Sequence, residues 1–307
     1  MRGRGYLLVA CAALLWALIG LFARAVLDRG VTPLEIAFWR AALAGAAFVL
    51  HAALAGRLRL ARGRDLASLA AFALLGVTLF YAALVLAIET GGISLAFVLL
   101  YTAPAFVTLL AWPLLGERLT RVKLALLALA TLGVVLVASG GADTQGVRVS
   151  PTSLGWGLAS GVAYASYYLF GKWVLARYAP VTVFAVVLPI GALGLTPFVD
   201  FAPKDQVVWL LLVTLALVST YLAYLLYYTG LRQVEASRAV LVATVEPVIA
   251  ATLAAAVYGE RLGALGVVGA ALILTAALLA SWRRSHALPA RRSAAPVGDA
   301  GDGPTRP

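Results

Sequence analysis

The chain has 307 residues, of which 63% are hydrophobic and 12% charged. A soluble domain has about 45–50% apolar and about 25% charged residues, so the composition excludes a soluble protein and indicates an integral membrane protein. The net charge is +11, but the basic residues lie mostly in short loops and the tail, where they set membrane topology, so we expect no nucleic-acid partner.

The apolar runs predict an all-α membrane protein, because a spanning helix needs about 20 mostly apolar residues. Ten such helices are predicted, at residues 6–26, 34–55, 66–87, 93–115, 122–139, 154–175, 181–201, 207–229, 236–258 and 264–282. The first run is too long for a cleaved signal peptide and has a counterpart in the second half. Residues 140–153 are rich in Gly, Ser, Asp and Thr and form a predicted linker. Residues 283–307 form a predicted disordered basic tail.

The chain contains an internal repeat. Residues 81–137 align without a gap on residues 224–280 at a constant offset of 143, so that Ser94 falls on Ser237 and Pro104 on Pro247. Each half, 6–139 and 154–282, has five predicted helices. Because five is odd, the second copy must enter the membrane from the opposite side. Two inverted five-helix repeats are typical of transporters that work by alternating access.

Orientation follows from the distribution of lysine and arginine. These residues favour one side of the membrane by about three to one, with Arg57, Arg59, Arg62 and Arg64 contributing most. This bias predicts that both termini are cytoplasmic. The composition, rich in Ala, Gly, Val and Arg, indicates a bacterial cell membrane.

Two prolines hold equivalent positions in the fourth and ninth predicted helices, Pro104 and Pro247. A proline inside a helix removes one backbone hydrogen bond at a cost of about 3 kcal/mol or more. In lipid the freed carbonyl groups still need partners. The prolines either kink the helices for packing or expose backbone to a polar cavity. The second reading is favoured because both copies keep the proline.

Glu246 is the one acid predicted near the midpoint of a helix, and its repeat partner is Ala103. A charge at the bilayer centre costs roughly 2.5–3.5 kcal/mol on insertion scales. Glu246 is therefore either a protonated acid bonded to a neighbouring helix or a site of proton coupling or cation recognition.

Deep aromatic residues are candidates for lining a substrate cavity. Tyr164 and Tyr168 lie four residues apart near the middle of the sixth helix, and Trp16 is the repeat counterpart of Tyr164. Tyr81, Tyr101 and Tyr224 are further candidates, with an interfacial aromatic belt as the alternative.

Other charges have structural interpretations. Arg40 lies about two turns inside the second helix, where it could bind an anionic group. The favoured reading is structural, because Arg40 is close enough to the helix end to extend to the membrane surface. Glu117-Arg118 and Glu260-Arg261 are expected to cap helices or pair locally. One cysteine and two distant histidines provide no disulfide and no zinc ligands, so no metal and no cofactor are expected.

Several motifs together resemble the EamA family of the drug/metabolite transporter superfamily. They are Phe38-Trp39-Arg40, Tyr101-Thr102-Ala103-Pro104, Gly116-Glu117-Arg118-Leu119, Glu246-Pro247 and Gly259-Glu260-Arg261-Leu262. The resemblance covers residues 6–282 as two EamA units. It implies a ten-helix exporter or permease of small metabolites such as amino acids, with a central cavity between the halves.

The leading hypothesis is secondary transport of a small organic solute, amino-acid-like or drug-like, by alternating access. No Walker-type glycine loop is present, which argues against direct use of ATP. A passive channel or facilitator is the main alternative. An intramembrane enzyme is disfavoured because the sequence has no HExxH motif, no serine elbow and no paired catalytic acids. The oligomeric state is not predicted.

Overall fold

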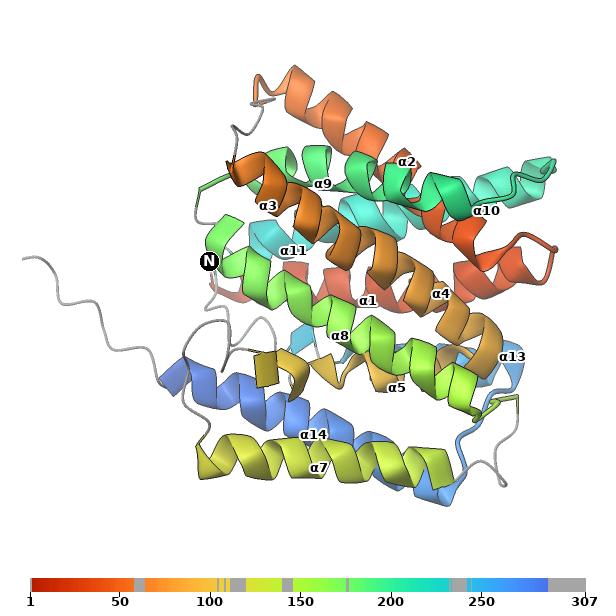
Figure 1. The fold of residues 1–307 in the computed structure, drawn as a ribbon, viewed down its shortest axis with the longest axis vertical. Coiled ribbons are helices and arrows are strands. Elements are labelled where there is room, and N and C mark those ends of the chain that lie inside the picture. The colour runs from red at the N-terminus through yellow and green to blue at the C-terminus, as the bar shows by residue number, and fades with distance from the viewer. Residues whose placement is uncertain are drawn as a thin grey trace, which may run out of the picture.

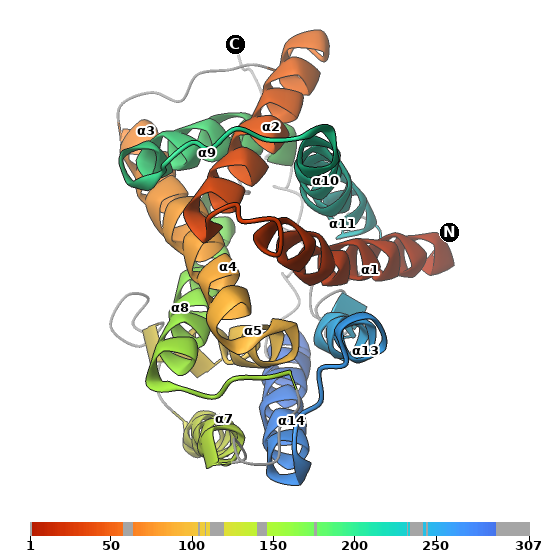
Figure 2. The same cartoon turned by 90° about the vertical axis from the view of Figure 1, so that its right-hand side faces the viewer.

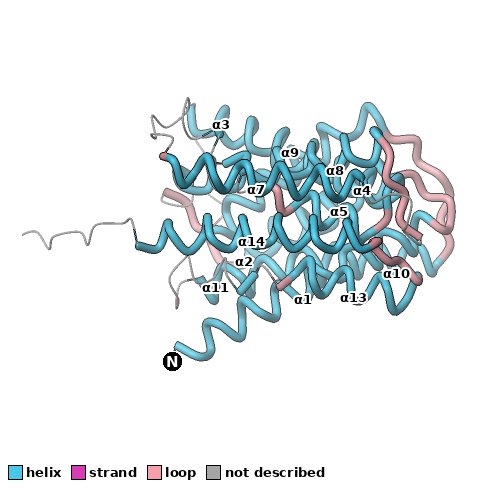
Figure 3. The backbone as a smooth tube through the Cα atoms, turned by 90° about the horizontal axis from the view of Figure 1, so that it is seen from below, coloured by secondary structure: helices cyan, strands magenta, loops and turns pink. Residues whose placement is uncertain are grey.

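The structure, a computed structural model, describes residues 2–57, 64–103, 105–107, 109–110, 120–139, 146–174, 177–231, 233, 242–243 and 245–286. This part of the chain is helical, and its helices lie side by side between two ends where the loops gather (Figures 1 and 3). Within these described residues, five helices are long and apolar enough to cross a membrane, and three shorter ones are also apolar. The prediction of an all-α membrane protein is confirmed.

The elements follow in chain order. They are α1 (Arg2–Leu27), α2 (Pro33–Leu54), α3 (Arg64–Ala73), a π-helical segment (Leu74–Leu79), α4 (Phe80–Gly91), α5 (Ile93–Leu100), α7 (Arg121–Ser139), α8 (Pro151–Val174), α9 (Pro180–Leu195), a 3-10 turn (Thr196–Phe198), α10 (Gln206–Ala216), a second π-helical segment (Leu217–Leu222), α11 (Ala223–Leu231), α13 (Glu246–Tyr258) and α14 (Ala264–His286). The third predicted helix is α3 with α4, and the eighth is α10 with α11. Residues 140–145 of the predicted linker and residues 287–307 of the predicted tail lie outside the described residues, and the last linker residues belong to α8.

Local sequence explains where several helices begin and end. Pro33 and Pro180 occupy the first turns of α2 and α9, where a missing N–H costs nothing. Asp205 accepts a hydrogen bond of 2.7 Å from the Val208 N–H and so caps α10. Gly92 separates α4 from α5 with a φ of 93°, and Gly259 ends α13 with a φ of 68°, both in the region that favours glycine.

The helices pack as an inverted repeat. The equivalent helices α7 and α14 lie against each other and run in opposite directions, and α2 packs on its equivalent α9 (Figure 1). Many of the other contacts occur in symmetric pairs: α4 packs on α8 as α11 packs on α1, and α5 packs on α8 as α13 packs on α1. The two halves are thus interleaved, with α5 facing α13 near the centre of the bundle (Figure 2).

The described loop residues gather at the two ends of the bundle (Figure 3). At one end the Arg148 N–H donates to the Gly91 carbonyl, and the Glu260 carboxylate contacts the start of α5. At the other end Asp65, which begins the third membrane segment, pairs with Arg177 at 3.2 Å and accepts a hydrogen bond of 2.6 Å from Tyr178. This hydrogen bond raises the pKa of the Tyr178 hydroxyl.

A buried ion pair attaches the loop before α10 to α2. The Lys204 ammonium pairs with the Glu35 carboxylate, and both side chains are almost completely buried. The Trp39 Nε1–H donates to the same carboxylate at 3.2 Å, and the ammonium lies 5.5 Å from the ring centroids of Trp39 and Trp209. The two tryptophans thus cover the pair and shield it from solvent.

We expect Lys204→Met to destabilise the protein by about 3–5 kcal/mol, because it leaves the Glu35 carboxylate buried without its cation. Thermal unfolding of the purified protein measures the effect. The double variant Glu35→Gln with Lys204→Met removes both charges and is the matched control; we expect it to recover most of the loss. A single variant as stable as the wild type would show that the pair does not hold the loop.

Candidate functional site

Two interrupted helices meet at the centre of the bundle. Helix α5 ends at Leu100 and is followed by a turn at Tyr101 and Thr102, whereas α13 begins at Glu246 directly after a turn at Val245. With the repeat offset of 143, Thr102 corresponds to Val245, so both copies break their helix at the same place. Interrupted helices at corresponding positions of two inverted halves are where transporters bind their substrates.

A hydrogen bond joins the two interruptions. The Tyr101 hydroxyl lies 2.9 Å from Oε2 of Glu246 and 2.9 Å from the Ala243 carbonyl oxygen. Glu246 is only 5% exposed, and Tyr101 is buried as well. The expected midpoint position of Glu246 in a continuous helix is wrong, because Glu246 is the first residue of α13.

The expected role of Pro247 is also corrected. It lies in the first turn of α13, where a backbone N–H has no partner within the helix, so the proline removes no hydrogen bond. Its effect is to define where α13 begins. Pro104, its repeat partner, lies outside the described residues.

Aromatic side chains surround the interior next to these breaks. The Trp16 ring lies 5.8 Å from Tyr224 and 5.1 Å from Tyr227, and Phe184 stacks on Tyr224 at 4.4 Å. The hydroxyls of Tyr167 and Tyr224 are hydrogen-bonded at 2.9 Å. These contacts join α1, α8, α9 and α11 across both halves.

The aromatic cluster continues onto α4 through Phe80. The Phe80 ring stacks on Tyr164 at 5.5 Å and lies 5.8 Å from Tyr167 and 5.7 Å from Tyr81. The structure therefore brings together four of the predicted aromatic residues, Trp16, Tyr81, Tyr164 and Tyr224. Tyr168 lies in α8, but its side chain is outside what the structure describes.

Arg40 occupies the interior of the bundle, so the expectation that it extends to the membrane surface is wrong. Its side chain is 1% exposed. The Arg40 Nε–H donates to the Thr220 hydroxyl at 2.9 Å, and the guanidinium carbon lies 3.9 Å from the centroid of the Tyr81 ring. Packing of α2 between α9 and α10 turns this side chain inward.

Two π-helical segments were not predicted, and the second contains a direct partner of this arginine. Leu74–Leu79 and Leu217–Leu222 are related by the repeat offset of 143. The wider turn is visible in the bond from the Phe80 N–H to the Leu75 carbonyl, five residues back. Such segments occur frequently at functional sites. The second one presents Thr220 to Arg40.

Comparison with known proteins decides the family. The chain matches the EamA-like transporter family over residues 3–139 and 152–282, one match for each half. The chain belongs to the EamA-like transporter family. It is therefore a membrane transporter and not an enzyme, and the predicted resemblance is confirmed.

Relatives of this family cover most of the chain. An uncharacterized transporter of Archaeoglobus fulgidus is 30% identical over 251 residues, which are 80% of this chain and 87% of the relative. The uncharacterized inner membrane transporter YicL of Salmonella typhimurium is 27% identical over 91% of this chain and 95% of its own length. A solved crystal structure with 20% identity superimposes with a TM-score of 0.60, covering 94% of this chain and all of the other, which supports the same fold.

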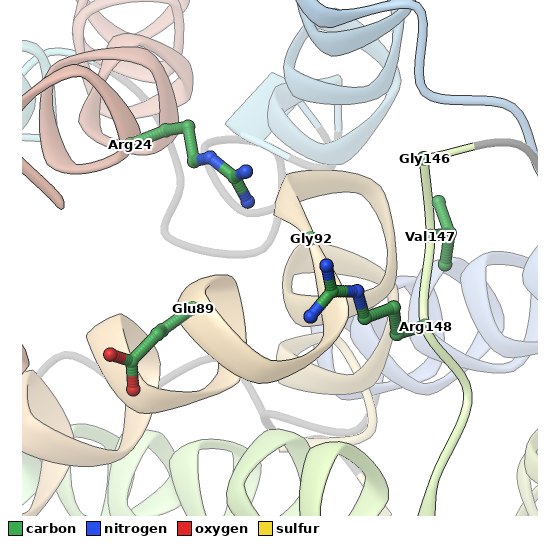
Figure 4. Close-up of a pocket in the computed structure, with 6 residues that line it drawn as sticks. All are labelled: Arg24, Glu89, Gly92, Gly146, Val147 and Arg148. Carbon is green, nitrogen blue, oxygen red and sulfur yellow. The ribbon is translucent and has the colours of Figure 1, made fainter. Parts of the chain in front are cut away.

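One end of the bundle carries a cavity of about 240 Å³. Its lining residues are Arg24, Glu89, Gly92, Gly146, Val147 and Arg148. Arg24 and Arg148 extend toward each other from α1 and from the segment before α8 (Figure 4). Glu89 lies in the last turn of α4.

Glu260 borders this cavity end and caps a helix of the other half. Its carboxylate accepts hydrogen bonds from the Ile93 N–H at 3.0 Å and the Ser94 N–H at 2.9 Å, at the start of α5. The capping role is therefore as predicted, but the expectation that it is local is wrong. The equivalent Glu117 lies outside the described residues. Among the described residues no three His, Cys, Asp or Glu side chains gather into a metal site.

Proposed function

We propose that this EamA-like transporter moves a small organic solute across the bacterial inner membrane by alternating access, as an exporter coupled to protons at Glu246. The solute is amino-acid-like or drug-like. The observation that carries this proposal is the hydrogen bond between Tyr101 and Glu246. It connects the interrupted helix of one half to the interrupted helix of the other, at the centre of the bundle.

The geometry around Tyr101 suits a carboxyl group that gains and loses a proton. One hydroxyl hydrogen has two acceptors at 2.9 Å, the Glu246 carboxylate and the Ala243 carbonyl. When Glu246 is ionised, Tyr101 donates to the carboxylate. When Glu246 is protonated, the acid donates to Tyr101, and Tyr101 donates to Ala243. Both protonation states are therefore satisfied without movement of the backbone.

The inverted packing supports alternating access over a passive pore. Most contacts between helices of the two halves have a symmetric counterpart, so exchanging the conformations of the halves would yield a similar arrangement open to the other side. The solute-binding region then lies between the halves, where the aromatic cluster and Glu246 are buried.

Counterflow tests this function. Purified protein is first screened against a metabolite library for thermal stabilisation, because a ligand that binds only the folded state raises its stability by mass action. Proteoliposomes loaded with an excess of the unlabelled ligand should then accumulate the labelled ligand transiently. A carrier shows this overshoot, whereas a channel only equilibrates the label. Simple equilibration would overturn the proposal in favour of the passive facilitator.

We also propose that both termini are cytoplasmic, as the arginine distribution predicts. Reporter fusions at Arg62 and Ser285 should read cytoplasmic, and a fusion at Asp143 should read external. The YicL relative is called an inner membrane transporter, which supports the membrane assignment. A cytoplasmic reading at Asp143 would contradict the orientation.

A further inference from the structure

We propose that Arg40 and the tyrosine hydroxyls beside it bind an anionic group of the solute, most simply a carboxylate. The inference deepens the proposed transport function and rests on it, because the anion is taken to belong to the transported molecule. It arises from a buried arginine that the fold surrounds with hydrogen-bonding groups. Among the described residues no carboxylate lies within ion-pair distance of it, and Glu246 interacts with it electrostatically from farther away.

Arg40 is incompletely partnered although it is buried. Its Nε–H bonds Thr220, but Nη1 has no hydrogen-bond partner among the described residues, and no carboxylate of those residues lies within ion-pair distance. A buried guanidinium without an ion pair is costly, and proteins rarely keep one. Its two terminal nitrogens can hold a carboxylate through two parallel hydrogen bonds.

The neighbouring hydroxyls point to the same ligand. The Tyr81 hydroxyl is also buried without a hydrogen-bond partner in the described part of the chain, and the Arg40 guanidinium lies over the Tyr81 ring. The Tyr81 hydroxyl also lies close enough to the hydroxyls of Tyr167 and Tyr224 to interact with them, and those two hydroxyls bond each other. An anion held between these hydroxyls and Nη1 of Arg40 would give Nη1 the partner that it lacks among the described residues.

The internal repeat does not explain why an arginine occupies position 40, because its repeat counterpart is uncharged. Counting from the prolines that begin α2 and α9, the repeat counterpart of Arg40 is Val187, which is completely buried in the apolar core. The fold therefore accepts an apolar residue at this place. Arg40 lies among aromatic side chains, so an anion with an apolar or aromatic body fits the surroundings.

The test compares carboxylates with their uncharged amides, using full-length protein in detergent. The probes are acetate, butyrate and phenylacetate and the corresponding amides, and the readout is the unfolding temperature against probe concentration. We expect at least one carboxylate to stabilise the wild type while its amide does not. Arg40→Gln should weaken the apparent affinity for that carboxylate roughly ten- to hundredfold, since it loses hydrogen bonds to a charged group.

Two conservative variants and one control make the outcome decisive. Arg40→Lys, which keeps the charge without the planar fork, and Tyr81→Phe should each weaken carboxylate binding, and they remain informative if Arg40→Gln does not fold. Arg148→Gln tests the loop-end cavity. A carboxylate response that is lost in Arg148→Gln but kept in Arg40→Lys and Tyr81→Phe overturns the proposal. So does a wild type that no carboxylate stabilises.

The measurement is of binding at equilibrium and needs no transport. Counterflow that fails while the carboxylate response depends on Arg40 would overturn the transport mechanism and leave the anion site standing. Counterflow that succeeds with a solute whose binding does not depend on Arg40 would overturn the anion site and leave the transport mechanism standing.

Discussion

Glu246→Gln is expected to abolish uptake driven by a pH gradient while leaving counterflow of the same solute largely intact. Glutamine keeps the shape of glutamate and can still accept the hydrogen bond from Tyr101, but it cannot bind or release a proton. The measurement is transport into proteoliposomes with and without an imposed pH gradient.

Two further variants separate coupling from packing. Glu246→Ala removes the bond between α5 and α13 as well as the proton site, so we expect it to lower the amount of protein in the membrane. Tyr101→Phe keeps the carboxyl group and should retain some response to the gradient. If Glu246→Gln responds to the gradient as the wild type does, Glu246 has only a packing role.

Glu260→Ala should lower stability by about 3 kcal/mol or more. The substitution leaves the N–H groups of Ile93 and Ser94 without their acceptor at a buried helix start, and hydrogen bonds to a charged group contribute about 1.5–3 kcal/mol each. The effect is measured as a lower unfolding temperature and, because the bond joins the two halves, as lower transport activity.

Glu89→Ala is the matched control, since Glu89 lies at the same end of the bundle but its side chain is exposed. We expect its stability to change by no more than about 0.5 kcal/mol. Equal stability of Glu260→Ala and Glu89→Ala would mean that the cap between the halves contributes little.

The all-helical membrane fold could be predicted from the sequence, because membrane helices are specified by length and hydrophobicity. The inverted arrangement of the two halves could be predicted from the duplication. It also selected Glu246 and Tyr101, although it did not show that they touch. That contact depends on where the helices break. The break before Glu246 could not be placed, since a proline is compatible both with the interior of a kinked helix and with the first turn of a new one.

Arg40 was misjudged for a different reason. The distance of Arg40 from the helix end suggested that its side chain could reach the membrane surface. Whether the side chain points outward or inward depends on the rotation of α2 about its own axis. Packing of α2 against α9 and α10 sets that rotation. Likewise Tyr168 was predicted to line the interior and Tyr167 was not. The two residues lie four and three positions after Tyr164 on the same helix face, and helical periodicity alone cannot distinguish between them.

The matched π-helical segments carry information about ancestry. Each holds one extra residue in its turn, at positions that align between the two copies. The simplest history places this extra residue in a single five-helix ancestor, before its gene was duplicated. Such a unit, inserted in the membrane in both orientations, could have paired with itself to enclose the same interior. After the duplication each copy could change independently. Two resulting differences between equivalent positions are Arg40, whose counterpart is Val187, and Glu246, whose counterpart is Ala103.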